Sequence, residues 1–573
     1  MPTPTTLGTF VVVICLLASA SVPAQGVSYY VSASAGNDLN AGTSPAAPWQ
    51  SLARASNAPL LPGDRVLLRA DDTWAGEFVV GWSGSPTDPI IVGRYGVGAP
   101  PVIDGGSSMT TGAVYLDLRT DVIIEDLHLI GGQNTVEFRV CDRVVVRRCE
   151  IELASNYGVV ALWQPGIATI EDCHIHHCEN DAVNAYVTAV NVRGCNIHDL
   201  GTTLLAVDGI ALHDSFWPVS EISGNTIVGP FTKAGINGSR GPSGQGSRFV
   251  AHSNFISGRS KRAIGVYGLG SVGTAYNNVI VIAPDAANLG GGIVVVDQAT
   301  LTAHNNTIVN LNVVDAGPSF LADQAWNVDV RNNISYCASA ESMHWVLNST
   351  AAALMERNLY WPDDDPLSIG GRFDVNTTEI DFAAWENLGH DPTGLVADPQ
   401  FQGSVSSMTA TGARLQFGSP ARDAGEDLSS FFTVDFSGNP RPFGGAWDIG
   451  AWEFSVPTPA LSMTQPGGPG TPLIIENTGL TVGNEYFNVF SPEPCPGPVG
   501  SGIFLGLCAT NPAFLIAQVQ APVGAAPFHF IANQGAVTWA PVSVPPLTLD
   551  AVCFDFTGTQ LGPVAPVVRV AIQ

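Results

Sequence analysis

Lysine is almost absent from this sequence: 573 residues contain only Lys233 and Lys261. Fifty acidic residues against 23 basic ones leave a formal net charge of -27 at pH 7. Such a surface repels DNA, RNA and other uniform polyanions, which argues against a nucleic-acid partner. Charged residues make up only 13% of the chain, whereas 62 glycines and 41 prolines are present. Because long helices favour Glu and Lys and turns favour Gly and Pro, this composition predicts a mainly β protein.

Long hydrophobic runs are lacking beyond the N-terminus. Residues 1–25 combine the apolar run FVVVICLLASA with the small-residue end SVPAQG, a pattern typical of a secretory signal peptide cut after Ala24. That run is too short to span a bilayer, and no later run is long enough either. We therefore expect a secreted or cell-surface-associated product without a transmembrane segment. The sequence leaves the oligomeric state open.

The main body of the chain repeats. The segments IIEDLHL, VVRRCEI, TIEDCHI, NVRGCNI, EISGNTI, VAHSNFI, TAYNNVI and TAHNNTI align so that one column holds Leu127, Cys149, Cys173, Cys195, Asn225, Asn254, Asn278 and Asn306. An apolar residue recurs two places later, at Leu129, Ile151, Ile175, Ile197, Ile227, Ile256, Ile280 and Ile308. Such a repeat predicts a parallel β-solenoid of about ten coils over residues 100–360, with the four asparagines stacked in register.

The cysteines form no Cys-x-x-Cys pair. Cys149, Cys173 and Cys195 occupy the repeated column, where free cysteine is expected as a small buried residue rather than a metal ligand. Cys495 and Cys508 could form a disulfide in an oxidising compartment, although sequence alone leaves that pairing open.

A second strand recurs in each coil, in the segments NDAVNAYV, VDGIALHD, KAGINGSR and KRAIGVYG among others. Its apolar residues are expected to point inward, namely Val159, Val183, Ile210, Ile236, Ile264 and Ile293. Period-two alternation then predicts a solvent-facing set of Asn184, Tyr186, His213, Asn237, Ser239 and Tyr267. Both lysines precede the inward isoleucine by three residues, so we expect them at equivalent turn positions on adjacent coils. Asp181 and Asp208 should share a turn column on the preceding coils.

The lysines lie in a stretch that has no acidic residue. Between Ile222 and Pro284 there is no Asp or Glu, where average usage would place roughly five. The same stretch holds six basic residues, Lys233, Arg240, Arg248, Arg259, Lys261 and Arg262. One interpretation is chance, with lysine scarcity reflecting biased genome composition. The other is a groove for an anionic ligand, where convergent Lys and Arg offset repulsion by the rest of the molecule.

Several segments carry a resemblance to the secreted right-handed parallel β-helix proteins, loosely of the pectate-lyase-like superfamily. At the N-terminal end of the β-helix the resemblance rests on YYVSASAGNDLNAGTSPAAPWQSL, PGDRVLLRADDTWAG and SGSPTDPIIVGRYGVGAPPVIDGG. At its C-terminal end it rests on VADPQF, LQFGSPARDAG and WDIGAWEF. The resemblance covers residues 27–455. It implies an N-terminal cap with first coils (26–112), repeats (113–362) and terminal coils with closing loops (363–455). A Pro/Gly linker (456–470) and a small C-terminal β-sandwich-like domain (471–573) follow.

The resemblance implies action on an extracellular, acidic polysaccharide. In uronate β-elimination a Lys or Arg removes the C5 proton while Ca²⁺ or Arg neutralises the sugar carboxylate. The candidates for catalysis are Lys233, Lys261 and Arg262, and those for substrate binding are Asn184, Tyr186, His213, Asn237, Arg240 and Tyr267. Asp181 and Asp208 are the candidate Ca²⁺ ligands, only partly matching the family's paired-aspartate run. The alternatives are a glycoside hydrolase, an epimerase or a non-catalytic glycan-binding protein with Tyr186, Tyr267 and Trp217 as sugar platforms.

Other chemistry has weaker support in the sequence. The histidines of HIHHC, at 174, 176 and 177, flank a core position, and a structural role is favoured over a metal site. Asp363, Asp364 and Asp365 are expected in a solvated turn rather than as a hydrolase pair. Hydrolysis by paired carboxylates remains open through Asp181, Asp208 and Asp214.

Overall fold

The computed structural model describes most of residues 26–573. The exceptions are 108–110, 164–165, 202–205, 284–290, 312–316, 340–341, 363–371, 444, 456–458, 482, 557–560 and 562–563. The predicted signal peptide, residues 1–25, and the acidic run at 363–365 therefore lie outside the described residues. No helix in the described ranges is long and apolar enough to cross a membrane. The chain divides into two compact units, Met1–Phe454 and Ser455–Gln573.

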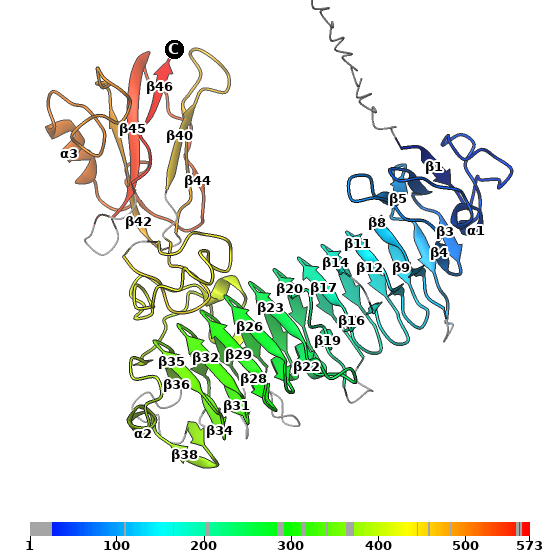
Figure 1. Cartoon of the computed structure of the whole chain (residues 1–573). Helices are drawn as coiled ribbons and strands as arrows, with labels where there is room; N and C mark the ends of the chain where they lie inside the picture. Colours follow the sequence, from blue (N-terminus) through cyan, green and yellow to red (C-terminus); the bar gives the residue numbers. More distant parts are fainter. Residues whose placement is uncertain are drawn as a thin grey trace, which may run out of the picture. The chain divides into compact units, whose positions relative to one another are not determined.

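The first unit is a β-solenoid, which confirms the predicted parallel β-helix. Its described residues form three sheets of thirteen strands, and the chain visits the sheets in turn (Figure 1). All neighbouring strands pair in parallel except β37 and β38. Between β7 and β36 each sheet gains ten strands, which matches the coil number predicted for residues 100–360.

The strands of the three sheets have the following bounds. Sheet A contains β1 (Ser28–Val31), β2 (Arg65–Arg69), β5 (Ile90–Tyr95), β8 (Thr120–Glu125), β11 (Asp142–Arg147), β14 (Ile167–Glu171), β17 (Ala189–Arg193), β20 (Ser220–Ser223), β23 (Arg248–His252), β26 (Val272–Tyr276), β29 (Thr300–His304), β32 (Asn327–Arg331) and β35 (Ala353–Glu356). Sheet B contains β3 (Thr73–Ala75), β6 (Val102–Asp104), β9 (His128–Ile130), β12 (Glu150–Glu152), β15 (His174–His176), β18 (Asn196–His198), β21 (Thr226–Val228), β24 (Phe255–Gly258), β27 (Val279–Ile282), β30 (Thr307–Asn310), β33 (Ile334–Cys337), β36 (Leu359–Pro362) and β39 (Leu395–Val396). Sheet C contains β4 (Phe78–Val80), β7 (Val114–Asp117), β10 (Val136–Arg139), β13 (Val159–Leu162), β16 (Val183–Tyr186), β19 (Ile210–His213), β22 (Phe231–Ser239), β25 (Ser260–Tyr267), β28 (Gly291–Val296), β31 (Phe320–Asp323), β34 (Trp345–Asn348), β37 (Phe373–Val375) and β38 (Thr378–Ile380).

The solenoid core is built from columns of like residues. The predicted apolar column of sheet B, from Leu129 to Ile308, is at most 2% exposed throughout. The predicted inward residues of sheet C, from Val159 to Ile293, are fully buried. Stacking like on like places each side chain over its equivalent one coil away, so the core continues through the interior of the coils.

The predicted asparagine column is confirmed. Asn225 Nδ2 donates to Asn254 Oδ1 at 2.9 Å, and the same contact recurs from Asn254 to Asn278 and from Asn278 to Asn306. The column continues beyond the prediction through Asn333 and Asn358 to Asp391. On the earlier coils the column holds Cys149, Cys173 and Cys195, which are free and buried as expected.

A short helix lies near each end of the coils. Helix α1 (Leu52–Ser56) packs against β4, and its N-cap Ser51 accepts a hydrogen bond from the Arg54 amide. Helix α2 (Phe382–Asn387) follows β38 and buries Trp385 against Phe373, with ring centroids 4.9 Å apart. Aromatic packing therefore covers the end of the hydrophobic interior.

Residues 397–454, here called the closing segment, run back along sheet B. Apart from the short 3-10 turns Val405–Ser407 and Thr411–Ala413, the described part of this segment has little regular structure. Its buried side chains join the outward apolar residues of β27, β30, β33 and β36 in one cluster. It also carries an ion pair between Arg441 and Glu453, both side chains fully buried, at 2.8 Å.

The second unit is a small β domain with two antiparallel sheets among its described residues. One holds β40 (Ala460–Thr464), β41 (Ile474–Thr478) and β44 (Val537–Thr538). The other holds β42 (Glu485–Ser491), β43 (His529–Ile531), β45 (Leu547–Asp555) and β46 (Val568–Ile572), with α3 (Ala513–Val519) against β42. Cys495 and Cys508 form a disulfide.

Candidate functional site

Four adjacent strands of sheet C, β16, β19, β22 and β25, carry nearly all the predicted site residues. The register pairs Val183 with Ile210 and Ile210 with Ile236, which sets Asp181, Asp208 and Ala234 at equivalent places on consecutive coils. Ala234 pairs in turn with Arg262. The strands thus bring residues from four coils into one column.

The two aspartates connect the coils through the backbone. Asp181 Oδ1 accepts a hydrogen bond from the Asp208 amide at 2.7 Å, and Asp208 Oδ1 accepts one from the Ala234 amide at 2.8 Å. Their residues are only 3% and 1% exposed. Each carboxylate therefore binds the backbone of the next coil.

Two asparagines bind the other oxygens of these carboxylates. Asn184 Nδ2 donates to Asp181 Oδ2 at 2.6 Å, and Asn237 Nδ2 donates to Asp208 Oδ2 at 2.9 Å. The prediction that both asparagines face solvent is wrong, because they are at most 1% exposed. Alternation gives the side of the sheet on which a residue lies, but the neighbouring side chains cover these two.

Lys233 lies beside the buried acids. Its Nζ is 3.3 Å from Asp208 Oδ2, and its side chain keeps 30% exposure. The expectation that both lysines occupy turns is wrong: Lys233 is within β22 and Lys261 within β25. These strands start earlier than their neighbours, and an irregularity in their pairing falls between Phe231 and Ala234. The lysines still lie on adjacent strands, next to the aligned pair Ala234 and Arg262.

The buried acids have perturbed titration. Burial, reinforced by the negative charge of Asp208, raises the pKa of Asp181 to about 7. Burial also raises the pKa of Asp208, a shift that the Lys233 ammonium opposes. The carboxyl group of Asp181 is therefore protonated below about pH 7.

An aromatic and polar column borders the lysines. Tyr186, His213, Ser239 and Tyr267 are register partners on successive coils. The rings of Tyr186 and His213 stack with centroids 4.5 Å apart, and His213 Nδ1 lies 2.8 Å from Ser239 Oγ. Burial lowers the pKa of His213 to about 4, so its imidazole is neutral at neutral pH.

Tyr267 turns its ring back across Gly265. A Cβ on Gly265 would lie 2.5 Å from the Tyr267 hydroxyl, so only glycine leaves room for that ring. The hydroxyl is buried, and among the described residues it has no hydrogen-bond partner. The same holds for the Oδ1 atoms of Asn184 and Asn237. Three buried polar atoms of this face thus lack a hydrogen-bond partner among the described residues.

The arginines are placed less uniformly. The Arg262 guanidinium lies over the Tyr267 ring at 5.6 Å, and Arg240 is exposed just after β22.

Two further contacts near this face could not be predicted from the sequence. Asp214 accepts backbone hydrogen bonds from Gly241, Ser243, Gln245 and Gly246, which fixes the loop after Arg240. Arg248 stacks on Phe216 at 4.4 Å.

The residues predicted to bind calcium suit a cation poorly. Ca²⁺ takes six to eight oxygen ligands. Here all four carboxylate oxygens of Asp181 and Asp208 already accept hydrogen bonds, and the Lys233 ammonium supplies the positive charge. The roles of the site residues stay predictions.

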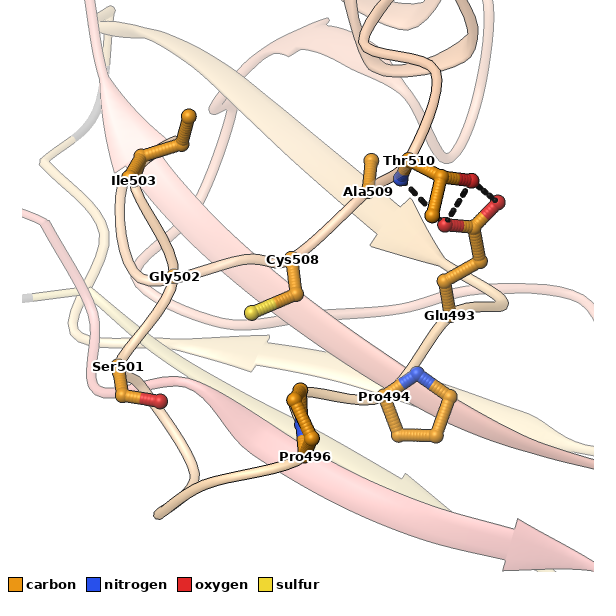
Figure 2. Close-up of a pocket in the computed structure, with 9 residues that line it drawn as sticks. All are labelled: Glu493, Pro494, Pro496, Ser501, Gly502, Ile503, Cys508, Ala509 and Thr510. Carbon is orange, nitrogen blue, oxygen red and sulfur yellow. Dashed lines mark hydrogen bonds between the residues drawn. The ribbon is translucent and has the colours of Figure 1, made fainter.

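Two surface depressions lie away from these strands. One, of about 520 Å³, is in the second unit beside Cys508, where Glu493 binds the amide and hydroxyl of Thr510 (Figure 2). The other, of about 400 Å³, is lined by residues of the first coils, including Arg69, Asp72 and Tyr95. Neither lining includes a predicted site residue.

Comparison with known proteins gives a family match over part of the chain. Residues 106–243 match the family described as "Right handed beta helix region". A lacto-N-biosidase of Bifidobacterium longum subsp. longum is 35% identical over 95 residues. That match covers 15% of this chain and 6% of the relative.

Solved structures with similar folds have low sequence identity. An alginate lyase from Paenibacillus sp. is 17% identical with a TM-score of 0.40, covering 52% of this chain and 98% of that chain. The pectate lyase Pel9A is 18% identical with a TM-score of 0.43, covering 75% and 97%. A lacto-N-biosidase from Eubacterium ramulus is 15% identical with a TM-score of 0.34, covering 65% and 67%.

Proposed function

We propose that the outer face of β16, β19, β22 and β25 binds an acidic extracellular polysaccharide and cleaves it by β-elimination. One observation carries the proposal: Lys233 is held at the surface by buried Asp208, in a 63-residue stretch that has no acidic residue. A partly exposed ammonium there, with Lys261 and Arg262 on the next strand, is suited to a carboxylate ligand. The enzymes named in the comparisons act on polysaccharides or oligosaccharides and support this substrate class by analogy only.

β-Elimination removes one proton from C5 of the uronate and supplies one proton to the oxygen that leaves C4. The neutral amine of Lys233 takes the proton from C5 of a uronate, and the electron pair forms the C4–C5 double bond as the C4–O bond breaks. Arg262 and Lys261 neutralise the sugar carboxylate, which makes the C5 proton removable. A solvent water protonates the departing oxygen, and Lys233 later returns its proton to solvent, because the Tyr267 hydroxyl is buried beside Gly265.

The buried acids position the base. Asp208 orients the Lys233 amine and is itself held by Asn237 and the Ala234 amide. The ion pair with Asp208 fixes the position of the amine, and lysine side chains are ordinarily charged at neutral pH. Because the base must lose its proton, turnover should rise with pH into the alkaline range.

The same ion pair also favours a second function. If Lys233 stays an ammonium, this face holds an anionic glycan without cleaving it, and Tyr186 and exposed Trp217 serve as platforms for sugar rings. Such a protein would be a glycan-binding or adhesive surface protein. Hydrolysis through the adjacent Asp181 and Asp208 is a third outcome for the test.

A panel of pectate, alginate and glycosaminoglycans tests these functions. Ultraviolet absorbance of an unsaturated product supports the lyase, new reducing ends without that absorbance indicate a hydrolase, and saturable binding alone indicates the binder. For the lyase, Lys233→Ala should abolish turnover while binding changes little, and Lys261→Ala should raise KM. Arg193→Ala, on the outer face of sheet A, is the matched control. Wild-type protein that neither binds nor cleaves any polyanion, or an active Lys233→Ala variant, would refute the proposal.

A further inference from the structure

The outer face of sheet B carries a cluster of histidines and glutamates on β9, β12, β15 and β18. Two columns alternate with the buried apolar column: one holds His128, Glu150 and His174, the other Glu152, His176 and His198. With His177, this cluster contains five of the eleven histidines in the chain. It is separate from the acidic and basic residues of sheet C described above.

Glu150 is the centre of this cluster. Its Oε1 lies 3.3 Å from His176 Nε2 and 4.0 Å from His174 Nδ1, and its Oε2 lies 3.8 Å from His128 Nε2. One ligand atom each of Glu150, His174 and His176 lies within 4.8 Å of the others. Ligands of a tetrahedral zinc ion with bonds of 2.0–2.1 Å lie about 3.3 Å apart, so small side-chain rotations suffice to close this set around an ion.

The second nitrogen of each candidate imidazole already has a partner. His174 Nε2 lies 2.5 Å from His198 Nε2, and His198 Nδ1 lies 2.7 Å from Asp199 Oδ2. His176 Nδ1 lies 2.6 Å from His177 Nδ1. Metal-binding histidines almost always donate their other ring N–H to a carboxylate, a backbone carbonyl or water. Here imidazoles take that place and fix the orientation of His174 and His176, and the carboxylate of Asp199 holds His198 in turn.

Exposure leaves room for an ion and for a further ligand. The side chains of Glu150 and His174 are each 42% exposed, whereas that of His176 is 8% exposed. The imidazole of His176 is thus fixed in the surface, and the side chains of Glu150 and His174 border solvent. Three protein ligands with an open fourth position differ from a closed structural zinc site, in which four protein ligands surround the metal.

We propose that Glu150, His174 and His176 bind one divalent transition-metal ion of the zinc class. Imidazole with carboxylate suits Zn²⁺ and its neighbours in the first transition row, whereas Ca²⁺ and Mg²⁺ take oxygen ligands. His198 and His177 orient the two imidazoles, and His128 with Glu152 border the carboxylate. The fourth position is open to water or to a donor atom of an external molecule.

Titration of the full chain with Zn²⁺ against a chromophoric chelator tests this site. We expect saturable binding of one equivalent, and Co²⁺ in its place should give the visible absorption of a tetrahedral centre. Glu150→Gln and His176→Ala should each lower the zinc affinity at least tenfold, and His198→Ala should lower it less. Millimolar Ca²⁺ should not displace the ion.

His252→Ala is the matched control, because His252 lies on β23 of sheet A beside Glu221 and belongs to none of the candidate ligand sets that the described residues form. Circular dichroism checks that each variant is folded, and Glu150→Gln, at a half-exposed position, is the least disruptive change. Absence of saturable zinc binding by the wild type would overturn the proposal. So would Glu150→Gln and His174→Ala variants that bind zinc as tightly as the wild type, because the cluster would then be a hydrogen-bonded network only.

Discussion

Replacing Asn254 by alanine should destabilise the coils strongly. The Asn254 side chain makes four hydrogen bonds: Oδ1 accepts from the amide and Nδ2 of Asn225, and Nδ2 donates to Ile222 O and Asn278 Oδ1. All lie between 2.9 and 3.0 Å, and the residue is fully buried. At a net value of about 1 kcal/mol each, their loss lowers the free energy of unfolding by about 4 kcal/mol.

Urea denaturation followed by tryptophan fluorescence measures this loss. Asn254→Cys should cost less than alanine, because Cys195 occupies the same column and its thiol faces the equivalent carbonyl, that of Ile170, at 3.6 Å. Asn196→Ala, at an exposed position on β18, is the control and should change stability by no more than about 0.5 kcal/mol. A loss below about 1 kcal/mol for Asn254→Ala would show that the column contributes little to stability.

Two further predictions concern buried charges. Because the pKa of Asp181 is raised to about 7, the folded state holds a proton that the unfolded chain releases between about pH 4 and 7. The melting temperature should therefore fall as pH rises through this range. Asp181→Asn should make that fall smaller. A steeper or unchanged fall in the variant would contradict the shift. Arg441→Met should lower the free energy of unfolding by about 3–5 kcal/mol because it leaves Glu453 buried without its cation, and adding Glu453→Leu should restore much of the loss in the same urea assay. Equal losses in the single and double variants would contradict this account.

The repeat made the solenoid predictable, because an apolar residue recurred in each coil two places after a column of cysteines and asparagines. The same alignment also contains the rest of the asparagine column and part of the histidine cluster. Asn333 and Asn358 continue the column in RNNIS and ERNLY, and the place after the column holds His128, Glu150 and His174 on successive coils. The segment HIHHC alone does not show Glu150 or His198 as partners of its histidines, because both contact them across coils.

The surroundings of the sheet C site could not be predicted in the same way. Alternation placed Asn184 and Asn237 on the outer side, yet hydrogen bonds to the aspartates and neighbouring side chains bury them. The salt bridge between Lys233 and Asp208 depends on where β22 begins, and the repeat does not fix that point. Variable insertions between coils leave such details outside the periodic signal.

Contacts between neighbouring coils and contacts made by the closing segment should form on different timescales. Coils stack through pairs about 22 to 30 residues apart, whereas Asn277 binds Val434 across 157 residues and Arg441 reaches back 164 residues to Asn277. Since closing long loops is slow, the coils should assemble first and the segment should dock last. Until it docks, the outward side chains of Val279, Val309 and Ile334 stay uncovered. The partly folded chain then exposes an apolar surface to which other chains can bind. Aggregation during folding should therefore depend on how quickly the closing segment docks.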